Sequence, residues 1–180
     1  IDGIEVTCMD VAMPMVIARA SDFGLVGNET QDELDNNNNF FERMEKVRLA
    51  AAKKMGMGDC TASVTPKFGI VAPNDQINHL TVRYFMPWRT HPTLAVTGSQ
   101  CIASCALTPD TVAYPLMTKS ESIPAHLVLH HPMGTMDVIT DYSLSDGMFV
   151  HKSAGIIRTA RKLAEGKVFI SSSIWDGDST

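Results

Sequence analysis

The stretch that most constrains this chain is residues 89–109, which read RTHPTLAVTGSQCIASCALTP. After Pro92 the residues are apolar or small on every side, with Leu94, Ala95, Val96, Ile102, Ala103 and Ala106 leaving almost no strongly polar face. A helix that is apolar all round is buried, and small residues such as Gly98 and Ser99 let strands pass close to it. The pair Thr108-Pro109 ends it. The sequence therefore predicts a buried helix that other elements must enclose.

Short strand patterns lie on both sides of this helix. Four are predicted before it, at residues 4–9, 15–18, 68–72 and 77–85. Six follow it, at residues 111–114, 126–130, 135–142, 148–151, 155–158 and 167–171, with Ser145-Asp146-Gly147 as a hairpin turn. Neither an internal repeat nor a linker divides the chain. The pattern predicts one α+β domain over residues 1–180, with antiparallel strands wrapped around one central buried helix.

One external helix is predicted over residues 40–55. Asn39 is positioned to cap it, and Glu42 follows three residues later at the capping-box spacing. Charged residues separate apolar ones that recur at helical intervals, namely Phe40, Phe41, Met44, Val47, Ala51 and Met55. Lys53 and Lys54 fall in the last turn, before Gly56. The helix is amphipathic and must lie on the rest of the domain.

Composition excludes several classes of protein. Apolar residues make up 44% of the 180 residues and charged residues 19%, with a net charge of -5, which is typical of a globular domain and not of a disordered or nucleic-acid-binding one. No apolar run approaches the roughly 20 residues that span a bilayer. Cys8, Cys60, Cys101 and Cys105 form no disulfide or zinc framework, so reduced thiols in a cytoplasmic protein are expected. The chain opens without a signal peptide or an initiator Met, which indicates a processed or partial chain.

The start of the buried helix is a candidate anion site. Its unpaired amides near Thr93 to Val96 and the helix dipole favour negative charge, and Arg89 and His91 lie just upstream. A guanidinium can bind a carboxylate in bidentate fashion, so a small polycarboxylate is the ligand class to test. In the alternative interpretation Arg89 pairs with a local acid, while Thr97 and Ser99 only bond the helix backbone. The residues alone leave both interpretations open.

Other candidates have simpler explanations. A metal site is not expected at His126, His130 and His131, because His131 points to the opposite strand face and no acidic or sulfur ligand lies close in sequence. The turn from His131 to Gly134 is either a ligand loop, in which glycine frees the backbone, or an ordinary hairpin turn. Arg158 and Arg161 are interpreted as a solvated or interdomain pair, with a reach into a cleft as the alternative.

Four segments, taken in order, resemble the C-terminal half of the PrpF-like proteins. They are residues 6–27, 89–101, 131–135 and 158–168. The resemblance implies the fold of diaminopimelate epimerase, in which two similar domains hold the substrate between them. It implies an isomerase or tautomerase of unsaturated di- and tricarboxylates such as 2-methylaconitate, 3-methylitaconate, aconitate and 4-oxalomesaconate, acting without a cofactor or metal. The proton-moving lysine and cysteine would lie in an N-terminal domain that these 180 residues do not include.

The resemblance also nominates substrate-binding residues in this half. They are Met13, Arg89, His91, Thr97, Gly98, His131, Met133 and Gly134. At two positions the residue of this chain differs from the residue that diaminopimelate epimerase has. Val96 stands where the epimerase has its second catalytic cysteine, and Met13 stands where it has a substrate-binding asparagine. Cys101 and Cys105, deeper in the helix, are interpreted as core residues.

Two hypotheses from different classes follow. The first is an isomerase that moves a proton allylically on an unsaturated polycarboxylate, with this segment inactive by itself and dependent on the N-terminal domain. The second is a non-catalytic protein of the same fold that binds small carboxylates. An amino-acid epimerase is disfavoured by Val96. Association with further copies of the chain is left open, and no nucleic acid or membrane partner is expected.

Overall fold

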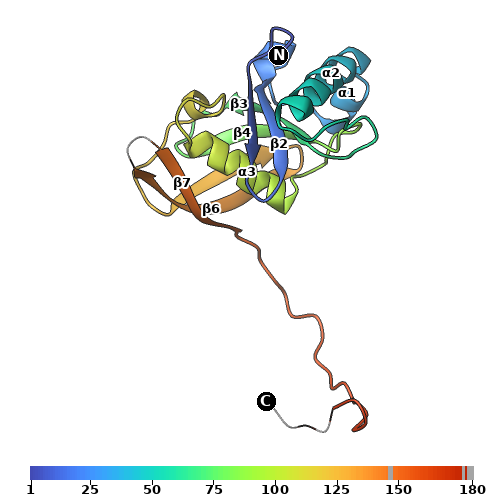
Figure 1. The fold of residues 1–180 in the computed structure, drawn as a ribbon. Coiled ribbons are helices and arrows are strands. Elements are labelled where there is room, and N and C mark those ends of the chain that lie inside the picture. Colours follow the sequence, from blue (N-terminus) through green and yellow to red (C-terminus); the bar gives the residue numbers. More distant parts are fainter. Residues whose placement is uncertain (146–147, 176, 178–180) are drawn as a thin grey trace.

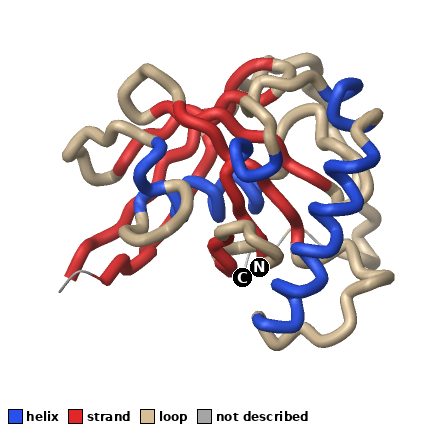
Figure 2. Tube along the Cα trace, turned by 90° about the horizontal axis from the view of Figure 1, so that it is seen from above, coloured by secondary structure: helices blue, strands red, loops and turns tan. Residues whose placement is uncertain are grey.

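A computed structural model describes residues 1–145, 148–175 and 177. Within them, seven strands form one curled sheet whose spatial order follows the chain (Figures 1 and 2). The strands are β1 (Val6–Asp10), β2 (Pro14–Arg19), β3 (Lys67–Pro73), β4 (His79–Phe85), β5 (Ala125–His131), β6 (Gly134–Ser145) and β7 (Met148–Ile156). The helices are α1 (Gln31–Asp35), α2 (Asn38–Lys54) and α3 (Val96–Leu107), with 3₁₀ turns at Ala20–Phe23 and Tyr114–Leu116. The domain is α+β, as predicted.

The sheet is mixed rather than antiparallel throughout, which corrects the prediction. Strands β2 and β3 pair in parallel, as do β4 and β5, while the other neighbours are antiparallel. The two parallel pairs arise because the connections between their strands are long. Parallel neighbours need a crossover of a dozen or more residues, and α1 and α2 lie between β2 and β3 while α3 lies between β4 and β5.

Helix α3 is buried, as its composition predicts. All residues from Gly98 to Leu107 are buried except Gln100, and the helix contacts β1, β2, β5, β6 and β7. It ends before Thr108, but it begins at Val96 rather than directly after Pro92. The delay has a local cause, because the Thr93 amide donates to Nδ1 of His91 at 3.0 Å. A side-chain bond of this kind competes with the first helical turn.

Helix α2 lies against the sheet, in contact with β3 (Figure 2). It packs on a second group of buried residues, separate from the group around α3. Phe40, Met44, Val47 and Ala51 are buried on its inner side, and Phe41 and Met55 pack partly buried beside them, so the predicted apolar stripe is confirmed. The helix begins two residues earlier than predicted, because Asn37 rather than Asn39 caps it by accepting a hydrogen bond from the Phe40 amide. Helix α1, for which the sequence analysis predicted no element, is held by a capping box between Thr30 and Glu33.

Three strand predictions need correction or restriction. Residues 111–114 form a turn, because the Thr111 hydroxyl donates to the carbonyl of Cys105 at 2.6 Å and holds the chain against the end of α3. Residues 148–151 and 155–156 belong to one strand, β7. Residues 167–171 are not a strand, since no neighbouring strand accompanies them. Asp146 and Gly147 of the predicted hairpin turn lie outside the described residues.

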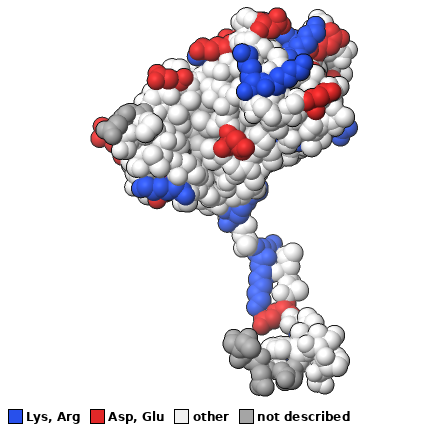
Figure 3. Space-filling view, in the orientation of Figure 1, with Lys and Arg blue, Asp and Glu red and all other residues white. Residues whose placement is uncertain are grey.

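After β7 the chain leaves the domain. Residues 157–175, which we call the C-terminal segment, extend away from the sheet (Figure 1). Lys and Arg side chains follow one another along it, whereas charges of both signs are scattered over the visible face of the domain (Figure 3). Among the described residues, none of the helices has both the length and the apolar character required to cross a bilayer.

Candidate functional site

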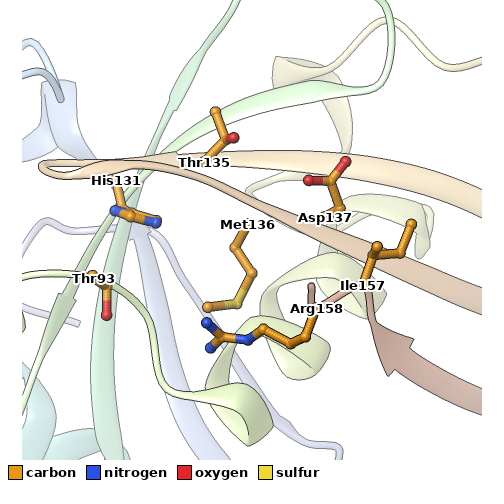
Figure 4. A pocket seen from close by; sticks show the side chains of 7 residues that line it. All are labelled: Thr93, His131, Thr135, Met136, Asp137, Ile157 and Arg158. Carbon is orange, nitrogen blue, oxygen red and sulfur yellow. The ribbon is translucent and has the colours of Figure 1, made fainter. Parts of the chain in front are cut away.

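A cavity of about 210 Å³ lies where the β5–β6 turn meets the segments before α3 and after β7 (Figure 4). Its lining comes from parts of the chain that are far apart in sequence: Thr93, His131, Thr135, Met136, Asp137, Ile157 and Arg158. Two regions that the sequence singled out, the approach to α3 and the turn after His131, therefore meet here. Arg158 joins them.

His131 is the last residue of β5 and lies on the same strand face as the buried Leu127 and Leu129. Its Nδ1 accepts the Met133 amide at 3.2 Å. Burial is the main cause that lowers the pKa of His131; a backbone hydrogen bond at Thr135 opposes it, and the neighbouring Arg83, His91 and Arg158 lower the pKa further. The imidazole is therefore neutral at neutral pH. Because Nδ1 is an acceptor, the proton lies on Nε2, which can donate a hydrogen bond.

Arg158 follows the end of β7 by two residues, and its backbone is anchored by the Ile157 amide, which donates to the Asp137 carbonyl at 3.1 Å. In Figure 4 its guanidinium extends across the cavity toward the side where Thr93 and His131 lie. None of the ion pairs within the described residues involves Arg158. The nearby Asp137 is bonded instead to Nε2 of His126 at 2.8 Å. The guanidinium is therefore available to an anionic ligand.

The start of α3 has no side-chain cap. Ala95 occupies the N-cap position and supplies none, whereas α1 and α2 are capped by Thr30 and Asn37. The Ser99 hydroxyl donates back to the Val96 carbonyl at 2.8 Å, as the alternative interpretation of the sequence expected for that residue. Thr97 is half-buried in the first turn, and its hydroxyl forms no such hydrogen bond within the described part of the chain. The first amides of α3 are thus left for a ligand or water.

Gly98 lets the Tyr84 ring approach the first turn of α3. A Cβ atom at residue 98 would lie 2.2 Å from Cε2 of Tyr84 and 3.0 Å from its hydroxyl oxygen. That hydroxyl is buried and has no hydrogen-bond partner within the described residues. Burial raises the pKa of Tyr84 to about 12, so the phenol stays protonated and can donate. This contact indicates that Gly98 allows close packing between α3 and the Tyr84 ring.

Arg89 and His91 belong to the loop between β4 and α3. Arg89 is exposed and is not among the residues that line the cavity. His91 is half-buried, its amide donates to the Tyr84 carbonyl at 2.8 Å, and its ring meets the Tyr84 ring edge-on. Burial is the main cause that lowers the pKa of His91. His91 therefore links Tyr84, through its backbone and ring, to Thr93 at the cavity.

The remaining candidates lie at two turns. Met13 precedes β2 and packs, partly buried, against the core around α3. Met133 is 73% exposed at the turn after β5. Gly134 begins β6 with φ of 135°, a conformation that favours glycine, and its surroundings are open.

Among the described residues, no group of three or more His, Cys, Asp or Glu side chains is placed to hold a metal ion. His130 lies on the opposite strand face from His131 and contacts His79, with Nε2 of His130 2.7 Å from Nδ1 of His79. His126 pairs with Asp137 instead.

Two buried groups near α3 predict a loss of stability at alkaline pH. Burial raises the pKa of Cys101 from 9.0 to about 12 and that of Tyr84 from 10.0 to about 12. The unfolded chain releases the Cys101 proton above about pH 9 and the Tyr84 proton above about pH 10, whereas the folded chain retains both. The free energy of unfolding therefore falls by about 1.4 kcal/mol per pH unit for each group until its folded pKa is reached. Urea unfolding at about pH 8 and about pH 11 measures the difference. A Cys101→Ala variant should show a flatter profile, and equal stability at both pH values would contradict the expectation.

Comparisons with known proteins give a consistent result. The family described as "PrpF protein" matches residues 2–171. The (4E)-oxalomesaconate Delta-isomerase of Novosphingobium sp. (strain KA1) is 35% identical over 94% of this chain and 47% of its own length. The 4-oxalomesaconate tautomerase of Pseudomonas putida (strain KT2440) is 32% identical over 98% of this chain and 48% of its own.

A solved structure shares the fold. The crystal structure of a methylitaconate-delta-isomerase superposes with a TM-score of 0.71 and 23% identity, covering 85% of this chain and 45% of that one. The chain thus spans about half the length of the curated relatives it matches.

Proposed function

The chain belongs to the PrpF protein family, as its four ordered segments predicted, and from this premise we propose that it is one domain of an isomerase. The proposed reaction is the allylic movement of a proton on an unsaturated di- or tricarboxylate, such as 2-methylaconitate, aconitate or 4-oxalomesaconate. Relatives named as oxalomesaconate and 2-methyl-aconitate isomerases support this substrate class. The reaction is proposed to need acid and base groups but no cofactor.

One observation carries the proposal. The Arg158 guanidinium lies in a cavity with the neutral imidazole of His131 and with Thr93, and no acid of the described residues pairs with it. A guanidinium can hold a carboxylate through two parallel hydrogen bonds, and a neutral imidazole adds a third donor without a second full charge. The start of α3, which lies three residues after Thr93 and lacks a side-chain cap, is proposed to add amide donors. These features are suited to binding a small polycarboxylate.

The same groups have a role in the chemistry. When a base removes a proton from carbon next to a carboxylate, negative charge spreads over the conjugated system and its oxygen atoms. Donors fixed around those oxygens stabilise the charge as it develops. In this domain the exposed Val96 stands at the start of α3, and burial raises the pKa of both Cys101 and Cys105. These thiols remain protonated and are not suited to act as bases. The proton-moving groups are therefore assigned to a second, N-terminal domain.

The proposal extends to the arrangement of the full-length protein. We assign the chain to the C-terminal position of a two-domain protein with a diaminopimelate epimerase-like fold, with strands enclosing α3 in this half. The cavity would then face the N-terminal domain across a cleft. Free cysteines at positions 8, 60, 101 and 105 are consistent with a cytoplasmic location.

Deuterium exchange tests the proposal. The full-length protein is incubated in deuterated water with aconitate-like and 4-oxalomesaconate-like acids, and proton NMR follows the carbon-bound hydrogens. We expect loss of the allylic proton signal together with a new double-bond isomer. Binding without exchange would leave a carboxylate-binding protein as the function. Racemisation of a free amino acid in the same assay would instead indicate an epimerase.

A further inference from the structure

The chain between β4 and α3 begins with a short extended stretch around Thr90. On one edge of this stretch the Arg89 carbonyl accepts the Met86 amide at 2.9 Å. On the same edge the His91 amide donates to the Tyr84 carbonyl at 2.8 Å. Neighbouring residues of an extended chain direct their amides and carbonyls to alternate edges, so those of Thr90 point away from β4. Thr90 is 0% exposed, and leaving its backbone groups unpaired would cost free energy.

Two side chains of α1 hold this second edge. The Asp35 carboxylate accepts the Thr90 amide at 2.7 Å, and the side-chain amide of Gln31 donates to the Thr90 carbonyl at 3.2 Å. Gln31 and Asp35 stand four residues apart and therefore lie on one side of the helix. Together they bind both polar groups of one backbone residue, as a neighbouring strand would. We call this pair of side chains the α1 clamp.

Helix α1 is itself fixed to the domain, beside α2 (Figure 1). Leu34 is 0% exposed in the group of buried residues that α2 covers, and the capping box of Thr30 and Glu33 holds the first turn. The Glu29 carbonyl, one residue before the cap, accepts a hydrogen bond from Nε of Arg83 on β4 at 2.6 Å. A helix of five residues is unstable by itself, so these anchors maintain it. The α1 clamp thus acts from a fixed support.

A short series of contacts joins the α1 clamp to the cavity. His91 follows Thr90 directly, and its Nδ1 accepts the Thr93 amide at 3.0 Å. Thr93 in turn lines the cavity. The His91 ring also meets the Tyr84 ring edge-on. The position of Thr90 therefore sets the positions of the His91 ring and, through it, of Thr93.

We propose that Gln31 and Asp35 are positioning residues for the carboxylate site, an inference that rests on the proposed function. Neither residue lines the cavity, so they act through Thr90 and not on the ligand. By holding the outer edge of Thr90 they keep Thr93 and the approach to α3 in place before a ligand binds. Donors that are fixed in advance need no reorganisation when charge develops on the substrate. Asp35 serves here as a hydrogen-bond acceptor and not as a charge.

Hydrogen exchange of the full-length protein, without any substrate, tests the α1 clamp. In Asp35→Ala the Thr93 amide should exchange at least about 10-fold faster, because the loop that holds His91 against it is released. Asp35→Asn keeps an acceptor oxygen without the charge and should restore slow exchange. Gln31→Ala removes the other arm without changing any charge and should also speed exchange at Thr93. Amides of α3 should remain protected in all these variants, which shows that the domain is folded.

Asp32→Ala is the matched control, because it removes the same side chain from the same helix but outside the clamp. It should leave exchange at Thr93 unchanged. If Thr93 exchanged equally slowly in Asp35→Ala, Gln31→Ala and the unaltered protein, the inference would be wrong. Loss of slow exchange in Asp35→Asn as well would mean that the charge and not the hydrogen bond matters, which also contradicts it.

Kinetics of the full-length protein connect the clamp to the site. Asp35→Ala should lower kcat/KM for the polycarboxylate about 10-fold through misplacement of the donors, whereas Asp35→Asn and Asp32→Ala should stay close to the unaltered protein. The exchange measurement uses no turnover. A working clamp in a protein without isomerase activity would therefore refute only the proposed function. Full activity and slow Thr93 exchange in Asp35→Ala would refute only this inference.

Discussion

Gly98→Ala is expected to destabilise the protein by about 3 kcal/mol, although alanine is the better helix former. At an exposed helical position the exchange would gain up to about 1 kcal/mol in helix propensity. At Gly98 the new Cβ would lie 2.2 Å from the ring of Tyr84, which is only 1% exposed. Overpacking of this kind costs about 1–3 kcal/mol and occasionally more, so the steric cost outweighs the propensity gain. Urea unfolding measures the difference.

The cause of this loss can be tested separately. Val96→Ala, in the same turn but at an exposed position, should change the free energy of unfolding by less than about 0.5 kcal/mol. Replacing Tyr84 with the smaller leucine should recover part of the stability of Gly98→Ala, as a double-mutant cycle would show. If Gly98→Ala were neutral or stabilising, the close packing between Tyr84 and α3 would not exist in solution.

Arg158→Ala is expected to lower kcat/KM of the full-length protein for its polycarboxylate roughly 10- to 100-fold. A hydrogen bond to a charged group contributes about 1.5–3 kcal/mol, and about 1.4 kcal/mol corresponds to a factor of ten. The loss should be this large because no acid of the described residues pairs with Arg158 and its guanidinium lies in the cavity. Arg158→Lys keeps the charge but not the bidentate geometry and should restore only part of the activity.

Two control variants make this prediction specific. Arg161→Ala removes the same charge three residues further on, outside the lining of the cavity, and should leave kcat/KM nearly unchanged. Arg89→Ala tests the cation that the sequence nominated first, which is exposed and lies outside the cavity lining. An unaltered kcat/KM in Arg158→Ala, with a strong rise of KM in Arg89→Ala, would move the proposed carboxylate site to the loop before α3.

Elements whose pattern is contained in one segment were predictable. The burial of α3 follows from its apolar and small residues, and the inner side of α2 follows from the spacing of Phe40, Met44, Val47 and Ala51. Helix α1 escaped prediction because five residues carry too little periodicity, although Thr30 and Glu33 stand at the capping-box spacing and could have indicated it. Residues 167–171 were predicted as a strand and form none. Local strand propensity is not sufficient, because a strand needs a neighbouring strand with which to pair.

The candidate site was predictable only in part. The sequence nominated His131 and the approach to α3 from their chemistry and from family resemblance. It nominated Arg89 as the cation and interpreted Arg158 as part of a solvated or interdomain pair, whereas Arg158 and not Arg89 lines the cavity. Which arginine lines it depends on strand pairing, because β7 pairs with β6 up to the contact between Ile156 and Val138, which carries Arg158 to the level of Met136. The parallel pairs in the sheet were missed for a related reason, since pairing direction is set by connections and not by strand composition.

The sequence by itself determined that this chain is a PrpF-family α+β domain with a buried helix and an amphipathic one lying on its surface. Hydrophobic pattern encodes these features because each depends on which side chains of one segment avoid water. The tertiary structure alone decided that Thr93, His131 and Arg158 line one cavity, that Gly98 packs on Tyr84, and that residues 163–170 form no backbone–backbone hydrogen bond within the described residues. Such contacts join residues far apart in sequence, and their geometry depends on strand register and on the direction in which the chain leaves the sheet.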